Sequence, residues 1–337
     1  MVPLETHVIK NARGIASVLK KLNARNIAGV FLLSCAALLT GCAGWTPQTK
    51  ALAENRPAGI PGVRELTEVP FFAQSEYQCG PASLAMVMVA AGAKVTPEEL
   101  VPQVYLPERK GSLQVEMLAA ARRHGLVSYQ LPPTYAALVQ EIAAGTPVII
   151  LQNTGIKEGW HYAVAIGYDW DNGMLQLRSG LNERQDMPMA MNELIWRRSG
   201  YWAMVAVPPD RIPASAEEDR WLAAIAALER TGQAAPARTA YGTFLKRWPE
   251  NVNASIGLAN THYSLGELRE AELVLRDAAK RAPDSPIVLN NLAQVLVDQG
   301  RAAEALPIID RAAAGGSHAE AVSQTRSEIL KKLGRSN

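Results

Sequence analysis

The hydrophobic pattern of the chain changes near residue 210. Between residues 66 and 206, short apolar runs alternate with segments of helical periodicity, and Asn172-Gly173 lies between two alternating runs, as is typical of a β-hairpin. Residues 216–337 are rich in Ala, Leu, Glu and Arg and contain no strand-like run. The pattern therefore predicts an α+β domain followed by an all-α domain.

The apolar runs and turn residues of the α+β domain place its elements along the chain. We expect helices at 80–92, 111–124, 135–144 and 189–197. A further helix should begin at the capping box that starts with Thr96. We expect strands at 69–72, 126–131, 148–151, 162–168, 174–178 and 201–207. A helix-rich first half followed by a strand-rich second half favours an antiparallel sheet.

Two proline-rich segments divide the chain. Residues 42–65 combine Pro, Gly and Ala without an apolar period, which is typical of a flexible tether. Residues 207–216 contain three prolines and indicate a linker between domains. The predicted domains therefore cover residues 66–206 and 217–334.

The N-terminal segment, residues 1–41, has the features of a secretory signal. Five basic residues and one acid precede an apolar run at 27–39 that is too short for a comfortable membrane span. The run ends in Leu39-Thr40-Gly41-Cys42, which resembles the lipobox of bacterial lipoproteins. The resemblance implies cleavage before Cys42 and its acylation, and Ala43 implies lipid attachment to the outer membrane, facing the periplasm. The alternative is an uncleaved anchor, which also places the chain outside the inner membrane.

A spacing of 34 residues recurs in the helical part. It relates Gly232, Gly266 and Gly300, then Ala237, Ala271 and Ala305, and also Pro249 and Pro283. In such a pattern Gly ends the first helix of a pair, Ala lets two helices approach, and Pro stops the second helix. The period resembles the tetratricopeptide repeat, which implies stacked helix pairs, a capping helix at 318–334 and a protein partner.

Composition excludes several classes of protein and draws attention to one thiol. The 34 Lys and Arg residues nearly balance the 32 Asp and Glu residues, so the charge gives no support to a nucleic-acid partner. Three cysteines are too few for a disulfide scaffold. If Cys35 leaves with the signal and Cys42 carries lipid, Cys79 is the one thiol of the mature chain. No His, Cys and carboxylate cluster has metal-site spacing, so neither a metal nor another cofactor is expected.

Cys79 and His161 have the surroundings of a nucleophilic pair. Cys79 stands at the start of a helix, where the free amide groups favour a thiolate and can bind an oxyanion. His161 stands at the start of a later strand, and Cys–His pairs on separate elements catalyse acyl transfer. Trp160, beside it, is expected either to line a substrate cleft or to pack in the core.

Four segments together resemble the bacteriocin-leader-processing (double-glycine) cysteine peptidases and their wider relatives, which have a papain-like fold. They are Gln74, Cys79-Gly80-Pro81-Ala82-Ser83, Gly145-Thr146-Pro147-Val148 and the strand that begins with His161. The resemblance covers residues 66–206. It implies that Cys79 is the nucleophile, that His161 is its general base, and that Gln74 donates a hydrogen bond to the oxyanion.

The spacing of Gln74 departs from that family. It lies five residues before Cys79, where many relatives have six, so Gln78 is the alternative oxyanion donor.

The family's orienting Asp is also missing. Ser179 takes its place as the candidate third member, although a neutral hydroxyl stabilises an imidazolium less than a carboxylate does. Asn182 is a second candidate. Asp169, Asp171 and Asn172 are expected to be too far from His161, because they lie at the hairpin turn.

The sequence thus predicts an envelope-anchored cysteine peptidase that hydrolyses a peptide bond, with helical repeats that bind a protein partner or the substrate. The missing Asp motivates one alternative, a non-catalytic lipoprotein that uses the same cleft to bind peptides during assembly. A second alternative keeps the chemistry but transfers the acyl group to an amine instead of water.

Overall fold

The computed structural model describes residues 46–74, 78–155, 159–314 and 318–335. The predicted signal and the predicted lipid attachment at Cys42 lie outside these residues. The chain divides into two compact units, and helix α3 (Pro47–Glu54) belongs to the first, which ends at Asn55. No helix within the described ranges is long and apolar enough to cross a membrane.

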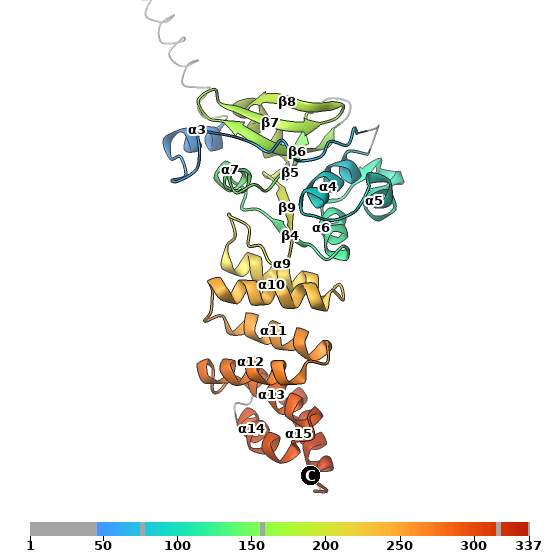
Figure 1. Cartoon of the computed structure of the whole chain (residues 1–337), viewed down its shortest axis with the longest axis vertical. Helices are drawn as coiled ribbons and strands as arrows, with labels where there is room; N and C mark the ends of the chain where they lie inside the picture. The colour runs from blue at the N-terminus through green and yellow to red at the C-terminus, as the bar shows by residue number, and fades with distance from the viewer. Residues whose placement is uncertain (1–45, 75–77, 156–158, 315–317, 336–337) are drawn as a thin grey trace, which may run out of the picture. The chain divides into compact units, whose positions relative to one another are not determined.

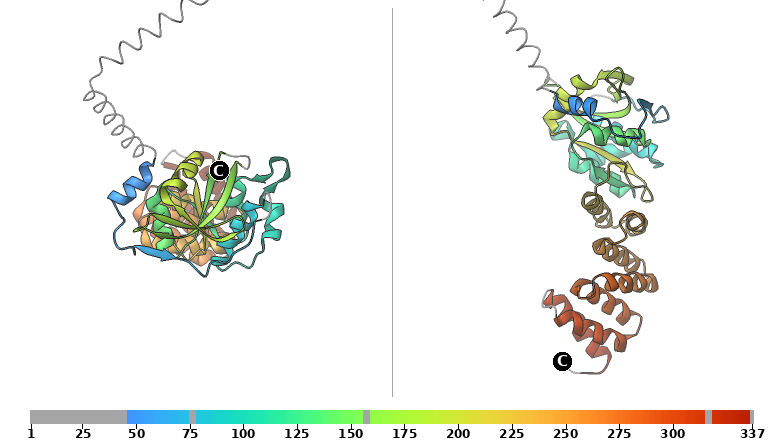
Figure 2. Two further views of the ribbon diagram at one scale, coloured as in Figure 1. Left: turned by 90° about the horizontal axis from the view of Figure 1, so that it is seen from above. Right: turned by 90° about the vertical axis from the view of Figure 1, so that its left-hand side faces the viewer.

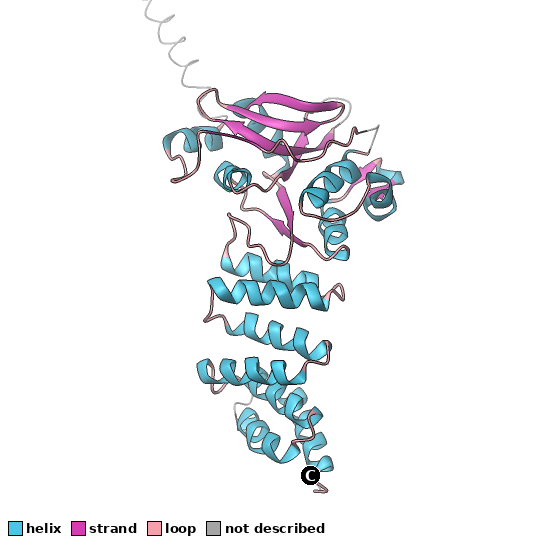
Figure 3. Ribbon diagram, viewed as in Figure 1, coloured by secondary structure: helices cyan, strands magenta, loops and turns pink. Residues whose placement is uncertain are grey.

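In the described residues, seven antiparallel strands form the sheet of the α+β domain (Figure 1 and Figure 3). The order is β4-β9-β5-β6-β7-β8, and β1 pairs with the far end of β6. The strands are β1 (Val63–Glu65), β4 (Val127–Gln130), β5 (Val148–Asn153), β6 (Trp160–Asp169), β7 (Met174–Ser179), β8 (Asn182–Pro188) and β9 (Ala203–Val207). The central strands β5 and β9 are almost wholly buried, whereas the edge strand β8 exposes most of its residues.

Helices cover both faces of this sheet (Figure 1). On one side lie α4 (Cys79–Ala90), α5 (Pro97–Val104) and α6 (Gln114–Arg123), and on the other lies α7 (Tyr135–Ala143). Helix α8 (Met189–Trp196) contacts α7, because the Tyr135 hydroxyl donates to the Met189 carbonyl (2.7 Å) and its ring packs edge-on against Trp196. A small hairpin of β2 (Tyr105–Leu106) and β3 (Gly111–Ser112) leads from α5 into α6. Helix α4 is apolar all round and packs against β6, so most of its side chains are buried.

The segment 69–72 is not the strand that its apolar residues predicted. The buried guanidinium of Arg178 donates hydrogen bonds to the carbonyls of Val69 (2.6 Å) and Thr67 (3.3 Å), and Pro70 has no N–H to offer a neighbouring strand. An arginine side chain therefore holds this backbone in place of a strand partner.

Regular structure also occurs where the sequence predicted none. The described part of the expected tether at 42–65 contains α3 and β1. After β7, the chain also forms strand β8, where no strand was predicted. Strand β1 has three residues, and its pairing with β6 is what makes it a strand. Strand β8 is mostly polar and charged, so a hydrophobic pattern does not reveal it.

The second part of the chain is a series of helix pairs followed by one more helix (Figure 1 and Figure 2). The helices are α9 (Glu218–Glu229), α10 (Ala234–Arg247), α11 (Val252–Ser264), α12 (Leu268–Arg281), α13 (Pro286–Asp298), α14 (Ala302–Ala314) and α15 (Ala319–Lys332). Gly232, Gly266 and Gly300 join the helices of each pair with positive φ angles of 79°, 77° and 79°. The 34-residue spacing thus predicted the turns of the repeat correctly.

Residues between the two domains are held against the first domain. Glu141 on α7 is completely buried and accepts hydrogen bonds from the Ser215 N–H (2.7 Å) and hydroxyl (2.6 Å). Tyr129 on β4 donates to the Ser215 carbonyl (3.3 Å), accepts from the Glu217 N–H (3.2 Å), and packs edge-on against Trp221 of α9. The segment predicted as a linker therefore carries specific contacts that fix α9 to β4.

Candidate active site

Cys79 is the first residue of α4 and lies half-buried against the start of β6. Burial raises the pKa of the Cys79 thiol, and hydrogen bonds with the backbone of Tyr162 and Gly80 offset only part of this rise. The sequence predicted that the helix start would favour a thiolate, but desolvation outweighs that effect and favours the neutral thiol. At neutral pH the thiol is protonated in the resting protein, and a base is needed to activate it.

Gly80 allows the start of α4 to approach the small hairpin closely. A Cβ atom at this position would collide with the Cβ and Oγ of Ser112, which belongs to β3. The Tyr162 hydroxyl donates a hydrogen bond to the Ser112 carbonyl (3.1 Å), so β3, β6 and the start of α4 meet at one place. The glycine that follows the cysteine is thus required by packing.

His161 is the second residue of β6 and is half-buried. Its Nε2 lies 2.9 Å from the Ser179 Oγ, at hydrogen-bond distance, so the structure joins these two predicted site residues. Asn182, the other candidate for this role, is exposed on β8. Asp169 lies at the opposite end of β6, where its carboxylate accepts hydrogen bonds from Asn172.

Gln74 is buried, with 7% of its surface exposed, and its side chain contacts three elements. Its Nε2 donates to the Ser83 Oγ on α4 (3.1 Å) and to the Tyr162 carbonyl on β6 (3.4 Å). Its Oε1 accepts from the Gly180 N–H in the β7–β8 turn (3.0 Å). The amide expected to face an oxyanion is therefore engaged within the protein.

Gln78, the alternative oxyanion donor, directly precedes the cysteine. It is the N-cap residue of α4 and is half-buried.

The backbone of Tyr162 connects these residues. Its carbonyl accepts hydrogen bonds from Gln74 and from the Ser83 hydroxyl (3.3 Å), while its backbone also bonds with the Cys79 thiol. Both Tyr162 and Ser83 lie within the segments that carried the family resemblance. A side-chain pattern gives no signal for a role played by a backbone amide, so the sequence did not reveal this connection.

Trp160 precedes His161 and is 53% exposed, so it lies on the surface and not in the core. Of the two expectations for this residue, core packing is therefore wrong. Among the described residues, no group of three or more His, Cys, Asp or Glu side chains is placed to hold a metal ion.

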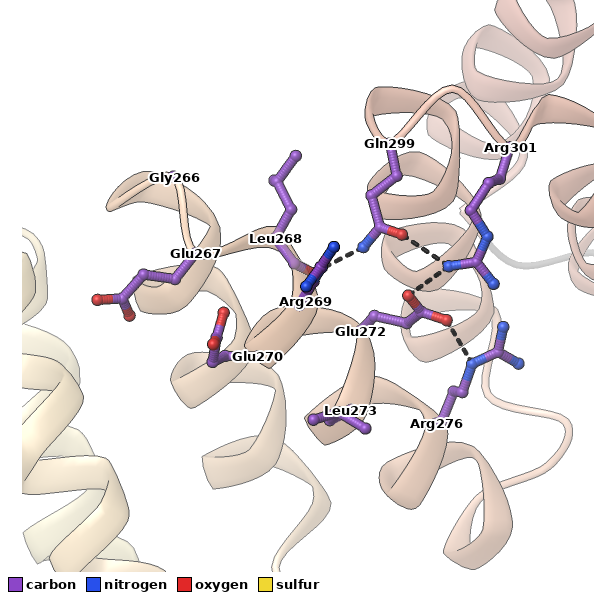
Figure 4. Close-up of a pocket in the computed structure, with 10 residues that line it drawn as sticks. All are labelled: Gly266, Glu267, Leu268, Arg269, Glu270, Glu272, Leu273, Arg276, Gln299 and Arg301. Carbon is purple, nitrogen blue, oxygen red and sulfur yellow. Dashed lines mark hydrogen bonds and ion pairs between the residues drawn. The ribbon is translucent and has the colours of Figure 1, made fainter.

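A hollow of about 820 Å³ lies on the repeats along α12 and the α13–α14 turn (Figure 4). At its centre Glu272 accepts hydrogen bonds from Arg276 (2.7 Å) and Arg301 (2.6 Å), and Arg301 also donates to Glu304 (2.7 Å). These charged groups are paired with one another across two repeats. The residues that line the hollow thus form an ion-pair network that joins neighbouring repeats. They do not include a nucleophile paired with a base.

Two family models match the chain. Residues 66–204 match the Peptidase_C39 like family, and residues 222–286 and 256–320 match the tetratricopeptide repeat. No curated protein matches the chain.

Solved structures resemble the two parts separately. A protein from Bacillus anthracis described as a C39-like peptidase is 19% identical, with a TM-score of 0.37, and the match covers 43% of this chain and 97% of that one. The TPR2B domain of yeast Sti1, solved with pHsp70, is 19% identical, with a TM-score of 0.33, and the match covers 34% and 97%. YrrB, a TPR protein with an unusual peptide-binding site, is 18% identical, with a TM-score of 0.32, and the match covers 35% and 61%.

The family models agree with the sheet-and-helix domain that carries Cys79 and His161 and with the helix pairs that follow it. The chain therefore contains a C39-like peptidase domain at residues 66–204, followed by tetratricopeptide repeats at 222–320.

Proposed function

We propose that this protein is a cysteine peptidase in which Cys79 is the nucleophile and His161 the general base. The observation that carries the proposal is the hydrogen bond between His161 Nε2 and Ser179 Oγ, next to Tyr162, whose backbone bonds with the Cys79 thiol. In this proposal Nε2–H donates to Ser179, which orients the ring, and Nδ1 is the atom that accepts the thiol proton. The match of residues 66–204 to a peptidase family supports peptide bonds as the substrate class.

The proposed reaction passes through a thioester. His161 Nδ1 takes the thiol proton, and the sulfur of Cys79 attacks the carbonyl carbon of the peptide bond. The oxyanion is stabilised by the Cys79 N–H and by the side chain of Gln74 or of its alternative, Gln78. When the C–N bond breaks, the imidazolium gives its proton to the leaving amine. Water, deprotonated by the same ring, then hydrolyses the thioester to an acid and restores the thiol.

Alkylation of the thiol tests the pair without knowledge of the substrate. Iodoacetamide should modify Cys79 in the wild type at neutral pH, and His161→Ala should slow this modification by about tenfold, because a thiol with a raised pKa ionises little on its own. His124→Ala is the matched control, since His124 ends α6 and contacts Gln103. Normal alkylation of the His161→Ala protein would contradict the pair.

Product masses from a synthetic peptide library distinguish hydrolysis, acyl transfer to an amine and binding without reaction. Hydrolysis adds the mass of water across the cleaved bond, whereas transfer to an added amine yields a new amide. Binding without turnover, retained in a Cys79→Ala variant, would contradict the peptidase and identify a peptide-binding protein.

We further propose that the protein is anchored in the cell envelope through lipid on Cys42 and that its repeats bind a protein partner. The lipobox-like Leu39-Thr40-Gly41-Cys42 supports the anchor, and the repeat family, whose members generally mediate protein–protein binding, supports the partner. Labelled palmitate should enter the wild type but not a Cys42→Ala variant. Equal incorporation into both proteins would rule out lipid attachment at this cysteine.

A further inference from the structure

Strands β6 and β7 separate beside the candidate catalytic pair. Their pairing ends at Val164 and Arg178, and the same register continued by two residues would place Tyr162 opposite Gly180. The polar groups of Gln74 lie between these two residues instead. The separation of the strands is therefore bridged by a side chain.

Gln74 makes the hydrogen bonds that a continued ladder would make. Its Nε2 donates to the Tyr162 carbonyl (3.4 Å), and its Oε1 accepts from the Gly180 N–H (3.0 Å). Its backbone N–H also donates to the Gly180 carbonyl (3.0 Å). The buried side-chain amide of Gln74 thus links the two strands across a wider separation than a direct backbone hydrogen bond spans. It can do so because it supplies both a donor and an acceptor.

This bridge sets the spacing of the candidate site. Tyr162 follows His161 in β6, and Gly180 follows Ser179, whose hydroxyl contacts the imidazole. The Tyr162 backbone, which the bridge contacts through its carbonyl, also bonds with the Cys79 thiol. A change in the length or polarity of the bridge would therefore move the histidine, its serine partner and the thiol relative to one another.

The same contacts engage Gln74 in the resting site. Its Nε2 is directed to the Tyr162 carbonyl and to the Ser83 Oγ (3.1 Å). Ser83 itself donates to the Tyr162 carbonyl (3.3 Å), which closes a buried three-membered network.

We infer that Gln74 is a positioning residue that holds β6 and the β7–β8 turn at the separation the Cys79–His161 pair requires. The inference rests on the proposed function above. It adds a structural role to the one that the family resemblance implies for this glutamine.

Alkylation separates the two roles, because the attack of a thiolate on iodoacetamide is a displacement that forms no oxyanion. Gln74→Met keeps the length of the side chain but removes its donor and acceptor. If Gln74 positions the pair, this variant should alkylate at Cys79 about tenfold more slowly at neutral pH, and the midpoint of its pH profile should rise. If Gln74 serves only the oxyanion, alkylation should be unchanged while peptide hydrolysis falls, and that result would overturn the inference.

Gln176→Met is the matched control. Gln176 is also buried in β7, and its Nε2 contacts Asp186 on β8 (3.3 Å), away from the pair. Its alkylation profile should match that of the wild type, and circular dichroism should show that both variants fold. If Gln74→Met does not fold, Ser83→Ala replaces it, because this change removes one partner of Gln74 and should slow alkylation in the same direction. An unchanged rate in a folded Ser83→Ala protein would then refute the positioning role.

The experiment also separates this inference from the proposed function. Normal alkylation in His161→Ala overturns the catalytic pair itself. Slow alkylation in His161→Ala together with normal alkylation in Gln74→Met leaves the pair intact and overturns only the positioning role.

Discussion

At the scale of single residues, desolvation and one neutral partner decide how reactive Cys79 is. Burial raises the pKa of its thiol, and a serine takes the position where the resembled family has an Asp. A neutral hydroxyl orients the imidazole but does little to stabilise its protonated form. The resting site therefore keeps the proton on sulfur more strongly than a site with a carboxylate would.

A carboxylate at position 179 should strengthen the pair. In Ser179→Asp the negative charge favours the imidazolium, so the proton leaves the Cys79 sulfur more readily and alkylation at neutral pH should increase by about tenfold. The pH midpoint of alkylation should fall. Ser179→Ala should have the opposite effect, because the ring loses its hydrogen-bond partner.

Asn182→Asp is the control for this change. Asn182 pairs with Ser179 in the β7–β8 register but is exposed, so a carboxylate there is screened by water and should leave the alkylation profile unchanged. An effect at position 182 equal to that at position 179 would mean that general charge, and not the contact with His161, governs the thiol.

At the scale of elements, periodic segments were predictable and segments held by single contacts were not. The capping box at Thr96 and the 34-residue repeat were predicted correctly, because each leaves a local signature in side-chain type and spacing. Segment 69–72 has the apolar residues of a strand, but Arg178 fixes its backbone, and no local pattern reveals a contact so distant in sequence. The edge strand β8 was not predicted because its residues are mostly polar, and its pairing with β7 is what makes it a strand.

The candidate site divides in the same way. Cys79, His161 and Ser179 were predicted from residue type and position, and the structure brings His161 and Ser179 to within hydrogen-bond distance. The contacts of Gln74 depend on where two strands separate, which a residue pattern does not encode.

The interface between the second and third repeats should depend on pH through Glu272. Partial burial raises the pKa of this carboxyl, but hydrogen bonds from Arg301 and Arg276 outweigh burial and lower it overall. A lowered pKa stabilises the fold above the ordinary carboxyl pKa of about 4.3, and the stabilisation is lost as the pH falls below it. Glu272→Gln should therefore cost about 1 kcal/mol at neutral pH and progressively less in acid.

Thermal unfolding at several pH values would check this expectation. Glu270→Gln provides the control, because Glu270 is exposed on the same helix. A difference between wild type and Glu272→Gln that persists unchanged at pH 3 would show that the network does not act through the ionised carboxylate.

At the scale of the whole molecule, the peptidase domain and the first repeat helix share a core. Trp221 of α9 is completely buried, and its ring lies edge-on to Tyr129 of β4 with centroids 5.7 Å apart. Glu141 and Tyr129 also fix the backbone on either side of Ser215. The prolines at 207–216 lie where the sheet domain ends and the helical repeats begin. The contacts of Tyr129 and Glu141 nevertheless connect the two parts.

Trp221→Ala should therefore destabilise the peptidase domain as well as the repeats. Removal of a buried tryptophan costs about 3–5 kcal/mol, and amide exchange in β4 and β9 should accelerate together with exchange in α9. Trp248→Ala is the control, because Trp248 packs on Phe244 and Arg247 within the repeats. Exchange in β4 that stays at the wild-type rate in Trp221→Ala would show that the two parts unfold independently.

The contact between Tyr129 and Trp221 has a practical consequence for protein engineering. A recombinant fragment that ends at the proline-rich segment would lose the contact with Trp221 and expose Tyr129 of β4 to water. A cut after Gly232 would keep α9 with the sheet, because the turn there ends the first helix of the pair. Chimeras that exchange the repeats for those of another protein should accordingly be joined after α9, so that α9 stays with the C39-like domain.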